Sequence, residues 1–335
     1  MKRILLGLAT ALGLALAPVT AAAEGKLPMR IGFQTGDINV ILVYAANTGL
    51  FDKNGLDVKL SPFPAGPAML PALAASEIDI AWMGEFPSVT GYSSGLPLEI
   101  LFMERLDLTN VRLSANPAAG IAKVADLKGK KIGVAIGSTS HYHTLQALAQ
   151  NGLKPSDVTL VNLSPANMPP AYVAGQIDAA FVWEPNIGVI ERAGAKPIAT
   201  TKSLNMITGG VWVARKPFVA DNAETVKRFL TAWRQAQKDY KANPKDVRQY
   251  EAKRVNMAPE QFDALIAGQS ATNPDFEDIL TAGFMGPPGK EIDSRLMKHL
   301  QDIAAFLVEE KRIPAAPGNW PGLFNTKPIQ ALLAK

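Results

Sequence analysis

Short apolar runs alternate with segments of helical spacing over the first two thirds of the chain, and this alternation limits the fold more than any other feature. The expected strands are Met29–Gln34, Asp57–Leu60, Ile78–Met83, Leu98–Met103, Lys131–Ala135, Thr159–Asn162, Asp178–Trp183 and Gly210–Ala214. The helical segments between them include Val40–Phe51, Ala68–Ala75, His141–Asn151 and Pro170–Ala174. Alternation of this kind indicates βαβ units, so we predict an α/β protein with parallel sheets.

The pattern changes after about residue 216, where the chain is expected to become almost entirely helical. The segment 222–242 carries apolar side chains at helical spacing, so one of its faces should pack inward. These side chains are Val226, Phe229, Leu230, Trp233 and Ala236.

Two similar segments within the chain indicate two similar lobes. The segment 76–82 (SEIDIAW) matches 175–181 (GQIDAAF), and each follows a helical segment and leads into a new loop. Ligands of parallel sheets bind at the carboxyl ends of the strands. Two such lobes facing each other would therefore form a cleft with loops from both.

The N-terminus has the layout of a secretory signal peptide. Lys2 and Arg3 precede an apolar run from Ile4 to Val19, and an Ala-rich cleavage site ends at Ala23. The run is shorter than the roughly 20 apolar residues that span a bilayer, so we expect cleavage rather than a membrane anchor. The sequence has no cysteine, which excludes a lipid attachment point, disulfides and thiolate chemistry. We therefore expect a free periplasmic protein, not a lipoprotein.

Charge argues against nucleic acid as a partner. Without residues 1–23 the net charge falls from +4 to +2, and the Lys and Arg residues are scattered. Nucleic-acid binding would require a basic stripe. No metal-site spacing is present, and we expect no cofactor and no metal.

Five stretches resemble the periplasmic substrate-binding proteins of the nitrate/sulfonate/taurine importer group, most closely its taurine-binding members. They are Arg30–Thr35, Ala125–Ile132, Ser138–Tyr142, Gly175–Pro185 and Val211–Lys216, and they recur in order. The resemblance implies a type II periplasmic binding protein, in which two α/β lobes flank a ligand cleft and are joined by crossing segments, placed here near 103–112 and 205–213. It also implies an ABC permease with its ATPase as partner, and a monomer.

The implied division of the chain is discontinuous. Residues 1–23 form the signal peptide, 24–105 the first part of lobe 1, 106–210 lobe 2, and 211–335 the second part of lobe 1 with the C-terminal helices.

Hydroxyl residues at a strand-to-helix junction form a candidate anion site. Ser138, Thr139 and Ser140 follow Gly137, and a helix begins near His141. Helix N-termini expose unpaired N–H groups and the positive end of the dipole. The site would suit the three oxygens of a sulfonate. Local sequence alone favours a helix cap in an ordinary loop, whereas the resemblance favours the anion site.

Gln34, Thr35 and Asp37 occupy the analogous position in lobe 1, either facing the ligand or closing a turn with Asp37 as a helix cap.

Glu85 lies after the strand Ile78–Met83, where taurine-binding relatives tend to carry small hydroxyl residues. A buried carboxylate needs a cationic partner, so Glu85 would bind the ligand's ammonium group, unless it caps a helix or pairs with an Arg. The resemblance also suggests that Trp183 lines the pocket, with Glu184 beside it contacting the ligand or orienting the loop; otherwise Trp183 is core and Glu184 a cap.

One departure puts taurine itself in doubt. Relatives carry an acidic residue just before the strand that matches Val211–Val213, whereas this chain has Thr208-Gly209-Gly210. Glu85, with Asp37 or Glu104, would then receive the amine at another wall, or the ligand would be different, such as an alkanesulfonate or a guanidinium or amine compound.

The sequence therefore predicts a solute-binding component of an ABC importer that captures taurine or a related small sulfonate by hinge closure. A periplasmic sensor remains an alternative that sequence does not separate from transport. No motif for a metalloprotease, serine hydrolase, dinucleotide site or P-loop occurs, so we do not expect an enzyme.

Overall fold

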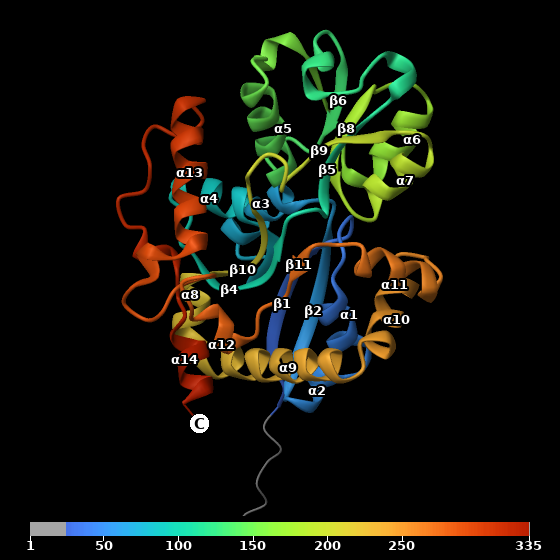
Figure 1. The fold of residues 1–335 in the computed structure, drawn as a ribbon. Helices are drawn as coiled ribbons and strands as arrows, with labels where there is room; N and C mark the ends of the chain where they lie inside the picture. Colours follow the sequence, from blue (N-terminus) through green and yellow to red (C-terminus); the bar gives the residue numbers. More distant parts are fainter. Residues whose placement is uncertain (1–24, 335) are drawn as a thin grey trace, which may run out of the picture.

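The computed structural model describes residues 25–334, and the expected signal peptide lies outside the described residues. Two sheets form the centres of two lobes, an upper and a lower one in Figure 1. The lower sheet has the strand order β11-β4-β10-β3-β1-β2, and the upper sheet has the order β7-β6-β8-β5-β9. The chain thus has the α/β architecture with two lobes that the sequence predicts.

The lower sheet comprises β1 (Leu27–Gln34), β2 (Leu56–Phe63), β3 (Ile80–Gly84), β4 (Leu98–Asp107), β10 (Thr208–Arg215) and β11 (Ala271–Thr272). The upper sheet comprises β5 (Val111–Ala115), β6 (Lys131–Val134), β7 (Thr159–Asn162), β8 (Ala179–Trp183) and β9 (Lys196–Thr200).

Four helices belong to the first lower-lobe segment: α1 (Val40–Asn47), α2 (Leu50–Lys53), α3 (Met69–Ala74) and α4 (Glu85–Ser93). Three belong to the upper lobe and contact β8: α5 (Thr139–Gln150), α6 (Met168–Val173) and α7 (Asn186–Arg192). The C-terminal part supplies α8 (Lys216–Asp221), α9 (Ala223–Ala242), α10 (Pro244–Arg254), α11 (Pro259–Ala267), α12 (Phe276–Ile279), α13 (Arg295–Glu309) and α14 (Lys327–Leu333).

The expectation of parallel sheets was wrong for β10 and the two-residue β11, which pairs antiparallel with β4, in the lower lobe, and for β5 in the upper lobe. β10 pairs antiparallel with β3 and β4, and β5 pairs antiparallel with β8 and β9. Both are strands through which the chain changes lobe: it leaves the lower sheet after Asp107, enters the upper sheet at Val111, and returns at Thr208. A strand that enters a sheet from the other lobe needs no crossover helix, so nothing requires it to run parallel.

The lower lobe packs its helices on an aromatic core. The predicted inner face of α9 is buried, and its Trp233 lies 4.9 Å from Trp212 of β10 and 5.5 Å from Phe102 of β4, between ring centroids. Truncation of buried aromatic side chains of this size costs about 3–5 kcal/mol each. This core holds β4 and β10, the two strands that lead into the crossing segments, in fixed positions.

A second contact joins the lobes away from the crossing segments. Helix α13 packs on α4 of the lower lobe and also reaches α5 of the upper lobe, where the rings of Tyr142 and Phe306 lie 5.0 Å apart. Figure 1 shows α13 running alongside both lobes. No helix within residues 25–334 combines the length and apolar character needed to cross a membrane.

Candidate functional site

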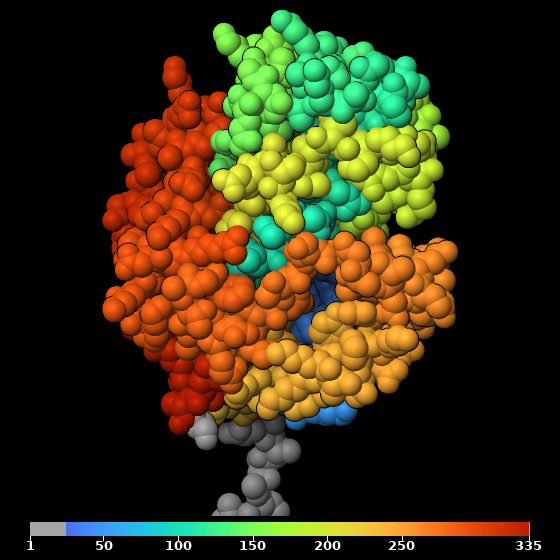
Figure 2. All heavy atoms as spheres, in the orientation of Figure 1, coloured from blue at the N-terminus to red at the C-terminus, as the bar shows by residue number. Residues whose placement is uncertain are grey.

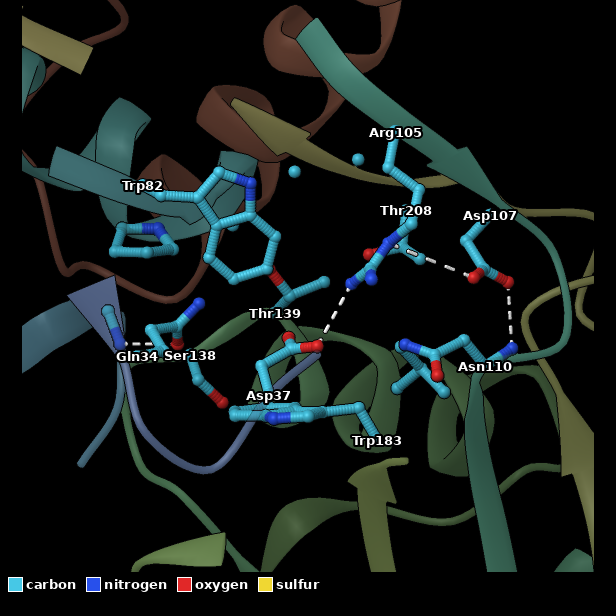
Figure 3. Close-up of a pocket in the computed structure, with 16 residues that line it drawn as sticks. Gln34, Asp37, Trp82, Arg105, Asp107, Asn110, Ser138, Thr139, Trp183 and Thr208 are labelled. Atoms are coloured by element: carbon cyan, nitrogen blue, oxygen red, sulfur yellow. Dashed lines mark hydrogen bonds and ion pairs between the residues drawn. The ribbon is translucent and has the colours of Figure 1, made fainter. Parts of the chain in front are cut away.

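A small cavity lies between the lobes, and both lobes and both crossing segments line it (Figure 3). The lower lobe contributes the ends of β1 and β3, and the upper lobe contributes the N-terminus of α5 and the end of β8. The cavity has a volume of about 30 Å³, measured by where the centre of a water-sized sphere fits. The carboxyl ends of β1, β3 and β8 meet there, as expected for ligand sites of α/β sheets.

One side of the cavity carries hydrogen-bond donors. Ser138 caps α5 in extended conformation, and its hydroxyl lies 2.9 Å from that of Ser140. The first N–H groups of a helix have no partner within it. Trp82 also lines the cavity, and its indole N–H and the hydroxyl of Thr139 are both buried without a hydrogen bond to any described residue. These donors and the helix dipole together favour an anion.

Glycine at position 84 lets the two lobes approach on this side. A Cβ atom placed there would lie 2.3 Å from Oγ1 of Thr139, which belongs to the other lobe. A hydrogen in place of a side chain therefore permits this interlobe contact.

The other side of the cavity carries charges. Nη2 of Arg105 donates to Oδ1 of Asp37 at 3.0 Å, and its Nε lies 4.0 Å from Oδ2 of Asp107. The guanidinium also lies over the ring of Trp82, 5.3 Å from the centroid. Burial raises the pKa of Asp37, and the attraction of Arg105 offsets this only in part. Burial would by itself lower the pKa of Arg105, but the surrounding carboxylates outweigh it and raise that pKa.

Trp183 joins the lobes at the floor of the cavity. Its indole N–H donates to the backbone carbonyl of Gly36 at 2.8 Å, and Nδ2 of Asn186 donates to the same oxygen at 2.8 Å. Trp183 lies at the end of β8 and Gly36 follows β1, so both bonds cross from one lobe to the other. The two lobes are therefore in a closed arrangement.

Unpartnered polar atoms gather at this cavity. Ten buried side-chain nitrogen and oxygen atoms of residues 25–334 have no hydrogen bond, and five of them belong to residues that line it. They are Nε1 of Trp82, Oγ1 of Thr139, Oδ2 of Asp107, and Nδ2 and Oδ1 of Asn110. An unpartnered buried polar atom costs about 1–3 kcal/mol, so such a concentration indicates a site built for a polar ligand.

The structure brings five of the predicted site residues to the cavity. Gln34, Asp37, Ser138, Thr139 and Trp183 line it. Gln34 also accepts a hydrogen bond from the backbone of Gly66 at 2.7 Å, so its amide is held in place.

Three other predicted residues lie near the cavity without lining it. Thr35 is exposed, and its hydroxyl donates to the carbonyl of Phe63 at 3.2 Å. Ser140 and His141 are buried in the first turn of α5. Burial lowers the pKa of His141 to about 4, with a smaller effect from Arg312, so the ring is neutral at pH 7.

Glu85, the expected ammonium partner, does not line the cavity. Its carboxylate is fully buried and accepts from the backbone N–H of Gly209 at 3.0 Å and from the hydroxyl of Thr208 at 3.4 Å, and it lies 3.3 Å from Nε2 of His299. Burial would raise its pKa, but His299 outweighs that effect and the pKa is lower than usual. Glu85 thus connects α4, β10 and α13, because it begins a helix beside the returning crossing segment.

Glu184 and Glu104 also have protein partners. Glu184 pairs with Nη2 of Arg112 at 2.5 Å and accepts from the N–H of Gly188, so it fixes the loop after β8. Glu104 accepts from the indole N–H of Trp212 at 2.8 Å and lines a second cavity. Burial raises the pKa of Glu104 to about 7. That second cavity is the hollow in Figure 2 where atoms of the N-terminal part show between C-terminal segments.

Sequence reasoning missed seven side chains of the cavity, among them Trp82, Arg105, Asp107 and Asn110. The last three lie within the expected crossing segment 103–112, where charged residues follow an apolar strand. A segment that crosses between two lobes necessarily borders the cleft between them. The polar residues of the expected crossing segment could therefore have been predicted to line the cavity.

The comparisons with known proteins agree with this architecture. Residues 38–247 match the family described as NMT1/THI5 like. The chain belongs to the NMT1/THI5-like family. This family member is 30% identical over 320 residues to the taurine-binding periplasmic protein of Escherichia coli strain K12, covering 90% of this chain and 95% of that protein.

Solved structures of the same fold include binding proteins and an enzyme. The alkanesulfonate-binding protein SsuA from Xanthomonas axonopodis pv. citri, bound to MOPS, superposes with a TM-score of 0.71 at 23% identity and covers 90% of this NMT1/THI5-like chain and 99% of its own. The desulfurization enzyme DSZB superposes with a TM-score of 0.65 at 15% identity, covering 91% and 99%. The fold alone therefore does not separate binding from catalysis.

Proposed function

We propose that this protein is the periplasmic solute-binding component of an ABC importer and that it captures taurine or a related small sulfonate. The observation that carries the proposal is the donor side of the interlobe cavity, where the N-terminus of α5 presents the hydroxyls of Ser138 and Thr139. A sulfonate is ionised at every physiological pH and offers three acceptor oxygens. It would supply partners for the unpaired donors without needing a dedicated cation.

Closure would couple binding to delivery. A ligand in this cavity contacts both lobes, whereas in an open form it would contact one at a time. That difference in contacts is what shifts the population toward the closed form. A permease that recognises the closed form would then receive only loaded protein. The resemblance to periplasmic proteins and the expected signal peptide support this location and partner.

A catalytic role has less support. His141 and His143 are buried in α5, and burial lowers the pKa of each to about 4. Neither lines the cavity, and the polar groups that do are hydroxyls, amides, indoles and one ion-paired cluster. We therefore propose binding rather than catalysis. Transport is favoured over sensing if genes for a permease and an ATPase lie alongside.

Thermal unfolding of residues 24–335 tests the proposal against taurine, a longer aminosulfonate, ethanesulfonate, sulfate and guanidinium. A ligand at 100 times its Kd stabilises the folded state by about 2.7 kcal/mol, so taurine should raise the Tm most. The variant Thr139→Val, which removes a hydroxyl that has no hydrogen bond within the described residues, should reduce the shift by sulfonates and leave the Tm without ligand nearly unchanged. Stabilisation by guanidinium alone would contradict the sulfonate assignment.

A further inference from the structure

The crossing segment between β4 and β5 carries two buried polar side chains, each with at least one atom that has no hydrogen bond in the closed protein. Asp107 ends β4 and Asn110 precedes β5, and both line the interlobe cavity. Asp107 is 1% exposed and Asn110 is 0% exposed. Figure 3 places them together, on the side of the cavity opposite Ser138 and Thr139.

The two oxygens of Asp107 have different surroundings. Oδ1 accepts from the backbone N–H groups of Thr109 and Asn110, at 2.8 and 2.7 Å, and so shapes the turn. Oδ2 has no hydrogen bond within the described residues, and the nearest cation, Nε of Arg105, is 4.0 Å away. Oδ1 of Asp107 thus has a structural role, whereas Oδ2 can accept a hydrogen bond from a ligand.

Arg105 does not balance the charge of the cavity. Its hydrogen bond goes to Asp37 at 3.0 Å, which leaves Asp107 with the longer contact. One guanidinium therefore faces two carboxylates that line the same cavity. A buried carboxylate that shares one guanidinium with a second carboxylate is incompletely compensated, so a ligand that brings a positive group to Asp107 gains a favourable interaction on binding.

Asn110 supplies a second acceptor at the same place. Both its amide atoms are buried and unpartnered, which in a core position would cost about 1–3 kcal/mol. Its backbone is fixed by the bond to Oδ1 of Asp107 and by its carbonyl, which accepts from the N–H of Glu184 at 3.2 Å. The backbone thus anchors Asn110 at the cavity, and its amide is free to bind a group that comes from outside the protein.

We propose that Asp107 and Asn110 form the subsite for a primary ammonium group of the ligand, with Oδ2 of Asp107 and Oδ1 of Asn110 as acceptors. The inference rests on the proposed function, and it narrows the substrate class from small sulfonates to short aminosulfonates, whose anionic end lies at α5 and whose cationic end lies at the crossing segment. Glu85, whose carboxylate is occupied by Gly209, Thr208 and His299, takes no part in ligand binding.

Isothermal titration of the mature chain with taurine and with ethanesulfonate, which differ only in the amino group, tests the assignment. Asp107→Asn keeps the Oδ1 acceptor that shapes the turn and removes the charge. It should weaken taurine at least about 30-fold, as expected when one partner of a buried charge pair is lost. Ethanesulfonate should bind Asp107→Asn as well as it binds the wild type, or better.

Two further variants separate the subsite from folding effects. Asn110→Leu should weaken taurine without lowering the Tm of the ligand-free protein, because the amide makes no hydrogen bond there. Asp126→Asn is the matched control, since Asp126 also accepts from backbone N–H groups, of Ala122 and Lys123, but is only partly buried and does not line the cavity. It should leave both affinities unchanged.

The outcomes distinguish this inference from the proposed function. If the wild type binds taurine and ethanesulfonate with equal affinity, or if Asp107→Asn weakens both equally, the sulfonate assignment stands and the ammonium subsite is refuted. If the folded wild type binds neither, the proposed function fails and the subsite fails with it.

Discussion

Replacing Glu104 by Gln should stabilise the protein above neutral pH and have little effect near pH 5. Glu104 is 7% exposed, and burial raises its pKa from 4.5 to about 7, against the attraction of Arg105 and the hydrogen bond from Trp212. In the unfolded chain the same group titrates near 4.5. Between these two values the folded state binds a proton that the unfolded state does not, so stability falls as the pH rises from 4.5 to 7.

The size of the effect follows from the two pKa values. A difference of one pKa unit corresponds to about 1.4 kcal/mol, so the charged carboxylate costs about 3 kcal/mol at pH 8. Gln keeps an oxygen that can accept from the indole N–H of Trp212, which lies 2.8 Å from Oε2 of Glu104, and its NH₂ group faces the second cavity. The variant therefore removes the charge and keeps the hydrogen bond.

Urea unfolding followed by circular dichroism, at pH 5 and at pH 8, measures this difference. The free energy of unfolding of Glu104→Gln should exceed that of the wild type by about 3 kcal/mol at pH 8 and by much less at pH 5. Glu309→Gln, at an exposed acid near the end of α13, is the control and should change neither value by more than about 0.5 kcal/mol. Equal gains at both pH values, or a loss at pH 8, would refute the burial argument.

Three other perturbations test closure and pH dependence. Trp183→Phe removes the interlobe bond to the carbonyl of Gly36; this bond contributes about 1 kcal/mol, so taurine affinity by titration calorimetry should fall about fivefold. Gly84→Ala places a methyl group 2.3 Å from Oγ1 of Thr139, so small-angle scattering with saturating taurine should give a larger radius of gyration than the wild type does. Burial lowers the pKa of His143 from 6.5 to about 4. Between these two pH values the unfolded chain binds a proton that the folded chain does not, so the Tm should fall as the pH drops from 6.5 to about 4. In His143→Leu this decrease of the Tm should be smaller.

Each of these predictions has a result that contradicts it. Unchanged taurine affinity in Trp183→Phe would mean that the bond to Gly36 does not contribute to the closed form. Equal compaction of Gly84→Ala and wild type would mean that the lobes close at a wider separation than the one described. A Tm that falls equally in His143→Leu would assign the pH dependence to other groups.

The sequence predicted eight of the strands, including β10, and missed β5, β9 and β11. Every expected run forms a strand, because each is apolar and bounded by turns. β5 was missed because Arg112 and Ser114 interrupt its short apolar run. Their partner Glu191 is 79 positions from Arg112 and 77 from Ser114, and Arg112 also pairs with the distant Glu184. β9 was missed because it contains Pro197, which an edge strand tolerates.

The candidate site was predictable where it depends on local structure. Ser138 and Thr139 follow from a strand-to-helix junction, which the sequence displays directly. Glu85 was predicted to bind the ligand because its partners in the folded protein, Gly209 and His299, are 124 and 214 positions away in the sequence. Asp107 was missed because its role depends on Arg105, which donates a hydrogen bond to Asp37 and makes only a longer contact with Asp107. Only the folded geometry determines which of the two carboxylates Arg105 contacts more closely.

A crystal structure of the mature chain with bound taurine tests the central claim most directly. We predict the sulfonate at the N-terminus of α5, within hydrogen-bond distance of Ser138 and Thr139, and the ammonium group within hydrogen-bond distance of Oδ2 of Asp107. Taurine bound in the reverse direction, or outside the interlobe cavity, would contradict the account.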